Sequence, residues 1–166
     1  MSGFQYRLQR LLEHKQEIKK QAEQQLRRRE EELEKQQATL ENLRRRLQEL
    51  VEKRQQLQRD LLSNPYMGET LSGREVQQRI ECIKAIGLEI EQAQADVSTQ
   101  RTVVEDWQRR VEQAKKEVQD ANREVEVLQK HRAKQEERFL REQERQEELA
   151  LDEIGNVLYT SRRTSL

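Results

Sequence analysis

The sequence predicts an all-α fold, a long antiparallel two-helix coiled-coil hairpin with a C-terminal helical overhang. Three observations lead to this prediction. The 166 residues are 39% charged and 33% hydrophobic, and they include only one proline and five glycines. Apolar residues recur every seven positions over most of the chain, which is typical of paired helices. A single break containing the proline divides this pattern into two parts.

The composition is too poor in apolar residues for an ordinary globule, and it favours an elongated helix over a disordered chain. A globular domain is about 45–50% apolar, so this chain has too few apolar residues for a packed core of the usual kind. Disordered chains usually carry a large net charge, whereas this one balances 32 basic against 32 acidic side chains. Residues 1–62 hold 15 basic and 11 acidic side chains, and residues 63–166 hold 17 and 21. The two halves should therefore attract each other, and we expect no nucleic-acid partner.

The first helix is expected from about residue 3 to about residue 62. A start signal at Ser2-Gly3-Phe4-Gln5 precedes it, and Pro65 disfavours helical geometry just after its end. Its leucines recur every seven residues, with Arg54 as the only interruption, at Leu26, Leu33, Leu40, Leu47 and Leu61.

A loop is expected from about residue 63 to about residue 72. It contains Pro65 and Gly68, which are typical of a break between helices. Tyr66 and Met67 would lie at its exposed tip, where they are candidate contact residues for a partner.

The second helix is expected from about residue 73 to about residue 154. Ser72 and Glu75 have the spacing of a capping box, and Leu71 and Val76 that of a hydrophobic staple. Eight β-branched residues then follow at unbroken heptad spacing, namely Val76, Ile83, Ile90, Val97, Val104, Val111, Val118 and Val125.

Asp152-Glu153-Ile154-Gly155 resembles a helix end, because Gly155 could adopt a left-handed cap. We therefore expect a tail from about residue 155 to residue 166, and we treat residues 1–166 as a single hairpin domain.

The two apolar seams differ, and their difference predicts how the helices pair. One seam is rich in leucine, and the other combines β-branched with mostly small residues, so large side chains can face small ones. Folding at the loop would bring Phe4 near position 130. Residues from about 131 to 155 would then overhang without an intramolecular partner, and such a helix is marginal alone.

No motif in the sequence predicts catalysis, a cofactor or a metal site. His14 and His131 would lie too far apart along the hairpin to share a metal, and no glycine-rich phosphate loop occurs. Cys82 is alone, which excludes an internal disulfide and fits a reducing compartment. No apolar run approaches the length of a membrane span. We expect a cytoplasmic protein without enzymatic activity or direct membrane insertion.

The two ends of the chain resemble the flagellar export protein FliJ family. Phe4-Gln5-Tyr6-Arg7-Leu8-Gln9-Arg10-Leu11-Leu12 is similar to that family's opening, F-x-[FY]-x-L-x-x-L-L. Glu144, Glu147 and Glu148 lead into Leu151-Asp152-Glu153-Ile154, which is similar to its acidic closing helix ending in L-D-E-[IL]. Gly155 departs from the pattern, which more often has alanine there. The related injectisome stalk proteins of the YscO family share this architecture.

The resemblance implies a stalk of the type III export ATPase, peripherally associated with the membrane export apparatus. Implied partners are the hexameric export ATPase, the export gate membrane protein and export chaperones, and the chain would act as a monomeric hairpin. The paired ends would enter the hexamer. The candidate contacts with the ATPase are Phe4, Tyr6, Leu8, Leu11, Leu12, Phe139, Leu149, Leu151, Asp152, Glu153 and Ile154.

Three other interpretations remain. The chain could be an injectisome stalk of the same superfamily, or a parallel homodimeric spacer unrelated to export. It could also be a hairpin chaperone that holds clients at its tip, through Tyr66 and Met67.

Overall fold

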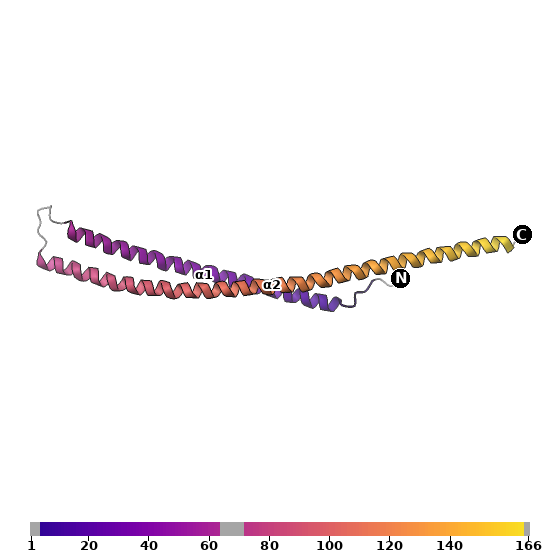
Figure 1. The fold of residues 1–166 in the computed structure, drawn as a ribbon, viewed down its shortest axis with the longest axis horizontal. Coiled ribbons are helices and arrows are strands. Elements are labelled where there is room, and N and C mark those ends of the chain that lie inside the picture. The colour runs from indigo at the N-terminus through magenta and orange to yellow at the C-terminus, as the bar shows by residue number, and fades with distance from the viewer. Residues whose placement is uncertain (1–3, 64–71, 165–166) are drawn as a thin grey trace. The chain divides into compact units, whose positions relative to one another are not determined.

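The computed structural model describes residues 4–63 and 72–164, with side chains to residue 160. Helix α1 comprises Gln9–Leu62 and helix α2 comprises Gly73–Thr164, and no strand occurs in these ranges (Figure 1). The predicted all-α helical hairpin is confirmed. The expected tip residues Tyr66 and Met67 lie outside the described residues.

The chain divides into two compact units. Unit 1 consists of Met1–Gln24 and Lys116–Leu166, and unit 2 consists of Gln25–Lys115. Each unit therefore combines a stretch of α1 with a stretch of α2, and each has its own apolar core.

The core of unit 2 follows the two predicted seams. Its buried side chains come mainly from α2, where they are β-branched or small: Leu40 from α1, with Ile86, Ile90, Ala93, Val104, Val111 and Ala114 from α2. Gln36 occupies a polar position in the leucine seam, and the amide nitrogen of Gln100 donates to its side-chain oxygen at 2.8 Å. This hydrogen bond satisfies a polar group that would otherwise be costly between two helices.

The start of α2 forms the predicted capping box. The backbone amide of Ser72 donates to the Glu75 carboxylate at 2.8 Å, and the Glu75 amide donates to the Ser72 hydroxyl at 3.4 Å. The amide and the hydroxyl of Ser72 both stabilise the charged carboxylate, so they lower the pKa of Glu75. The expected staple cannot be assessed, because Leu71 lies outside the described residues.

The end of α2 differs from the prediction. The helix passes through Asp152, Glu153, Ile154 and Gly155 without a break and continues to Thr164. Gly155 does not adopt the left-handed backbone that a glycine cap needs. A glycine inside a helix costs only about 1 kcal/mol, and no proline follows to stop the helix. The expected helix end at residue 154 was therefore wrong.

The start of α1 differs as well. The prediction began this helix at about residue 3, but residues 4–8 are not helical and α1 begins at Gln9. The Gln9 amide donates to the Tyr6 carbonyl at 3.1 Å, which closes a turn just before the helix. The chain before this turn lies against α2 instead of continuing along the axis of α1.

Candidate functional site

The terminal segments of unit 1 hold nearly all the candidate residues that the sequence singled out. We refer to residues 4–8 as the N-terminal strap and to residues 144–160 as the C-terminal arm. The strap contacts α2 through both of its aromatic side chains. Phe4 packs against Phe139, with 5.7 Å between ring centroids, and Tyr6 lies at the same separation from His131.

The two aromatic residues of the strap are two positions apart, on a segment in which residues 4–6 have no regular secondary structure and residues 7 and 8 form a turn. In an extended chain, residues i and i+2 point to the same side, whereas in a helix they would point in different directions. The extended backbone also rises about 3.3 Å per residue instead of 1.5 Å. Phe4 therefore reaches Phe139, beyond the position near 130 that the sequence predicted. The F-x-Y spacing was the signal for this conformation.

Polar contacts hold the middle of the strap. The Tyr6 hydroxyl donates to the Leu128 carbonyl at 3.2 Å and lies 2.9 Å from His131 Nδ1. Which of the two groups donates in the Tyr6–His131 hydrogen bond depends on the tautomer of the imidazole. Arg132 also donates to the side-chain oxygen of Gln9 at 3.4 Å, just after the strap.

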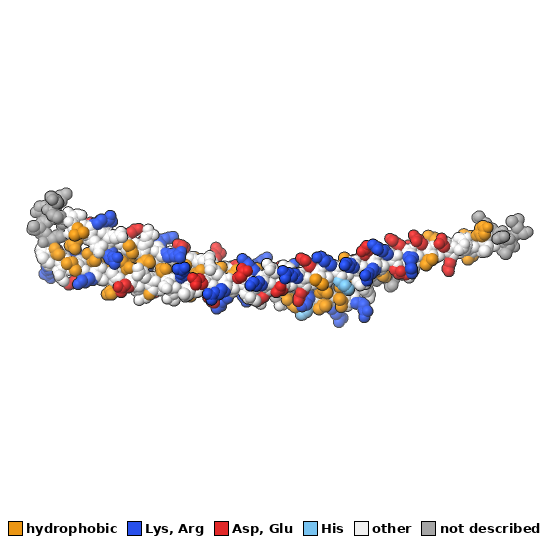
Figure 2. Space-filling model, in the orientation of Figure 1, with side chains coloured by type: hydrophobic (Ala, Val, Ile, Leu, Met, Phe, Trp, Pro, Cys, Tyr) orange, Lys and Arg blue, Asp and Glu red, His pale blue; other side chains and the backbone are white. Residues whose placement is uncertain are grey.

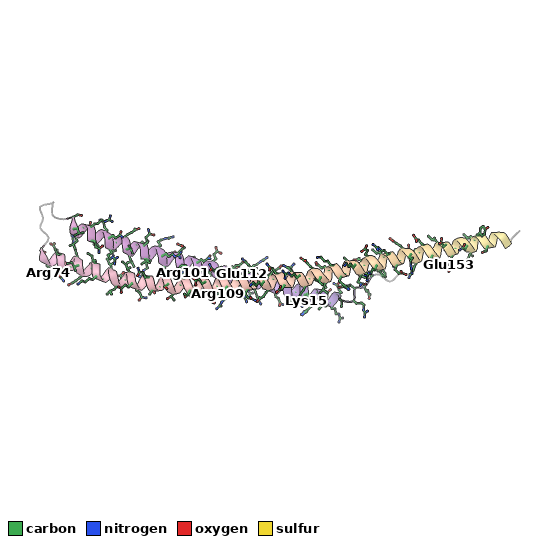
Figure 3. All side chains as sticks on the ribbon, in the orientation of Figure 1. Lys15, Arg74, Arg101, Arg109, Glu112 and Glu153 are labelled. Atoms are coloured by element: carbon green, nitrogen blue, oxygen red, sulfur yellow. The ribbon has the colours of Figure 1, made fainter. Side chains whose placement is uncertain are left out.

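The helices of unit 1 pair beneath the strap. Leu12 is only 2% exposed and packs in the core that Ala121 and Val125 supply from α2. Lys15 and Glu124 form an ion pair at 2.7 Å across the two helices (Figure 3). Because Leu12 is a core residue, a partner could reach it only if the two helices separated.

Hydrophobic side chains gather where the strap lies on α2 (Figure 2). Leu8 and Leu11 are large apolar residues of this part of unit 1, and 39% and 42% of their surfaces are exposed. The structure therefore places Phe4 against Phe139 and Tyr6 against His131 and Leu128, so the N-terminal end of the chain lies on α2.

The C-terminal arm is different, because all of its side chains are exposed. No other described segment of unit 1 covers it, and Glu153 projects from this single helix in Figure 3. The exposed apolar residues of the arm are Leu149, Leu151, Ile154, Val157, Leu158 and Tyr159. The last three lie beyond the helix end that the sequence predicted.

The arm is amphipathic and acidic. Leu151, Ile154 and Leu158 follow the i, i+3, i+7 spacing of one helical face. The arm also carries five carboxylates and a single arginine, Arg145, which pairs with Glu142 at 3.2 Å. Within the described residues, no cationic side chain forms an ion pair with Glu144, Glu147, Glu148, Asp152 or Glu153. The arm thus combines an apolar stripe with an excess of acidic over basic side chains.

The rest of the described surface offers open grooves instead of enclosed cavities. One groove beside the strap is lined by Tyr6, His131 and Gln135, among others. The described residues contain no cluster of His, Cys, Asp and Glu with the geometry of a metal site. No helix within the described ranges is both long and apolar enough to cross a membrane. The exposed apolar and acidic side chains of the C-terminal arm suit the binding of a macromolecular surface.

Comparisons with known proteins agree with this architecture. A family model described as YscO-like protein matches residues 3–164. The solved structure of a YscO homolog, CT670 from Chlamydia trachomatis, superposes with a TM-score of 0.79 at 21% sequence identity. The superposition covers 99% of this chain and 100% of that one, and at this identity it shows the shared fold. No curated protein matches the chain significantly.

Proposed function

We propose that this chain is a non-enzymatic coupling protein of a type III secretion apparatus, because it belongs to the YscO-like family of type III secretion stalk-type proteins. In this role the end of unit 1 inserts into the central hole of a hexameric export ATPase. The chain also links the ATPase to the export gate and to export chaperones, at the cytoplasmic side of the membrane.

The exposed acidic arm is the observation that supports this assignment most directly. A helix that leaves Leu151, Ile154 and Val157 in water while carrying five carboxylates is marginal alone and gains stability from a partner. The excess of acidic side chains favours a partner surface rimmed by Lys and Arg. Such an interface speeds association at low salt and weakens as salt is raised.

Stimulation of ATP hydrolysis by full-length chain tests the proposal. We expect the double substitution Ile154→Ser and Val157→Ser to abolish most of the stimulation of the purified export ATPase. Thermal stability should not change, because these side chains are exposed at 57% and 65%. Leu88→Ser is the matched control, since Leu88 is 69% exposed on α2 in unit 2. If the arm variant and the control stimulate equally, the arm does not contact the ATPase.

The chain could belong to an injectisome or to a flagellar export system. The family match favours an injectisome over the flagellar system that the terminal motifs predicted. The F-x-Y-x-L opening and the L-D-E-I motif still keep the flagellar assignment as the alternative. Pull-down of the tagged chain from native cells distinguishes the two, because the recovered ATPase would belong to one system or the other.

A further inference from the structure

The apolar seam of unit 2 is nearly uniform along its length. The β-branched residues of α2 repeat every seven positions, at Ile83, Ile90, Val97, Val104 and Val111, and the leucines of α1 repeat at the same interval. If α2 slid along α1 by one heptad, each of these leucines would meet another β-branched residue of the same kind. The slide would be about 10 Å, since an α-helix rises about 1.5 Å per residue. Packing between these two series therefore does not determine the register of the helices.

One polar pair interrupts the seam on both helices of unit 2. Gln36 precedes Leu43 by one heptad on α1, and Gln100 follows Ala93 by one heptad on α2. Both glutamine side chains are half-buried. The side-chain amide of Gln100 donates to the side-chain oxygen of Gln36 at 2.8 Å and to its backbone carbonyl at 3.1 Å. The polar position of each helix thus contacts the polar position of the other.

This pair can form in one register only. A slide of one heptad in one direction would bring Gln100 to Leu43, and a slide in the other direction would bring Gln36 to Ala93. Either slide leaves a half-buried amide against an apolar side chain that cannot form a hydrogen bond with it. A polar residue at a single core position is known to specify register in coiled coils, at a cost in stability.

Arg54, another polar position of the leucine seam, does not select the register in this way. Its Nε is enclosed and has no hydrogen-bond partner among the described residues. The observed register therefore satisfies the amide of Gln100 but not the Nε of Arg54, so a slide would cost hydrogen bonds only at the glutamine pair.

We propose that the Gln36–Gln100 pair determines the register of α1 and α2 in unit 2. Each slid register loses both hydrogen bonds of the pair, and a loss of this size shifts an equilibrium about tenfold. Register selection is a property of the free chain and is independent of the proposed function. In a stalk it would let unit 2 transmit a displacement along its axis without the two helices sliding past each other.

The distance between two spin labels on the full-length chain tests the register directly. In a Cys82→Ser background, Ala38→Cys and Gln78→Cys place the labels at exposed positions of α1 and α2 in unit 2. We expect a single distance in this labelled parent. When Gln36→Leu and Gln100→Leu are added, we expect a second distance that differs by about 10 Å, because the slid registers no longer lose a polar contact.

Moving one glutamine by a heptad tests the same inference in the opposite sense. Gln36→Leu combined with Leu43→Gln keeps one glutamine on α1 but places it where it meets Gln100 only after a slide. We expect the main distance between the labels to lengthen by about 10 Å, because this slide carries Gln78 away from Ala38.

The control replaces two exposed glutamines of unit 2, by Gln55→Leu and Gln94→Leu, and should keep the single distance of the parent. Chemical denaturation checks that every variant folds. Loss of both pair members should not lower the midpoint, since no unpaired amide remains. One unchanged distance in both the Gln36→Leu, Gln100→Leu variant and the Gln36→Leu, Leu43→Gln variant would overturn the proposal. The register would then be determined by the connection between the helices or by the remaining core. Two distances in the parent or in the control would overturn it as well.

Discussion

Arg54 is the residue at which the leucine seam of α1 breaks. Its side chain is half-buried in unit 2, and its Nε is enclosed without a hydrogen-bond partner among the described residues. An enclosed, unpaired polar group costs about 1–3 kcal/mol. Leucine at this position would complete the heptad series of Leu47 and Leu61 and would remove that cost.

We therefore expect Arg54→Leu to raise the free energy of unfolding by about 1–3 kcal/mol. Chemical denaturation followed by circular dichroism measures the change. Arg46→Leu is the control, because Arg46 is exposed on the same helix and its replacement should change stability by less than about 0.5 kcal/mol. An Arg54→Leu protein that is less stable than the parent would show that the arginine contributes favourably to the seam.

The contribution of the capping box to stability depends on pH through Glu75. The hydrogen bonds from Ser72 lower the pKa of its carboxyl in the folded protein. Protonation therefore occurs more readily in the unfolded chain, and the stabilisation is present above the unfolded pKa of about 4.3. It is lost as the pH falls through the lower, folded pKa.

We expect Glu75→Gln to lower the melting temperature at pH 7, and to lower it less as the pH approaches 3. The effect should be small, since the carboxyl is fully exposed. Thermal melts of both proteins between pH 3 and pH 7 give the comparison. A difference in melting temperature that is the same at every pH would mean that the charge of Glu75 is irrelevant to the cap.

At the scale of helices, the pairing of large with small side chains determines the packing. Ala114 is 1% exposed in unit 2, so its methyl group fills the space that the opposite helix leaves. A leucine there would have to displace its neighbours, and overpacking of this kind costs about 1–3 kcal/mol. We expect Ala114→Leu to reduce the free energy of unfolding by this amount. Ala95→Leu, at an exposed position on the same helix, should be nearly neutral, and equal effects would contradict the packing inferred for Ala114.

The sequence predicted the middle of both helices better than their ends. The heptad spacing identified the seam because burial repeats along the whole pair, and the Ser72–Glu75 cap was recognisable because its contacts are local. At Gly155 the local pattern was ambiguous, since glycine can either cap a helix or lie within it. The position of the strap depends on contacts over more than 120 residues, such as Tyr6 with Leu128, which local patterns cannot show.

Contact of the candidate residues with a partner stays a prediction. Folding at the loop was expected to bring Phe4 near position 130 of α2, and its ring lies against Phe139; the terminal motifs selected Leu151 and Ile154, which are exposed on the arm. They did not separate Leu12, whose side chain is buried, from its exposed neighbour Leu11. Which of two adjacent leucines is buried depends on the angle at which the second helix packs. That angle cannot be predicted from the sequence of one helix alone.

At the scale of the whole molecule, charge bears on whether the chain associates with itself. The arm carries five acidic side chains and one basic, so two arms that approach each other repel. The apolar stripe of Leu151 and Ile154 works in the opposite direction, because burying it against a second copy would be favourable. Repulsion between exposed charges is screened by salt, whereas burial of apolar surface is not weakened in this way.

We therefore expect a monomer of 20.0 kDa at low ionic strength, with any self-association appearing only as salt is raised. Light scattering coupled to size-exclusion chromatography measures the mass in both conditions. Leu151→Ser with Ile154→Ser is the control, because it removes two residues of the apolar stripe and should keep the chain monomeric in high salt. A stable dimer at low salt would contradict this balance and would favour the homodimeric spacer over the proposed stalk, which acts as a monomeric hairpin.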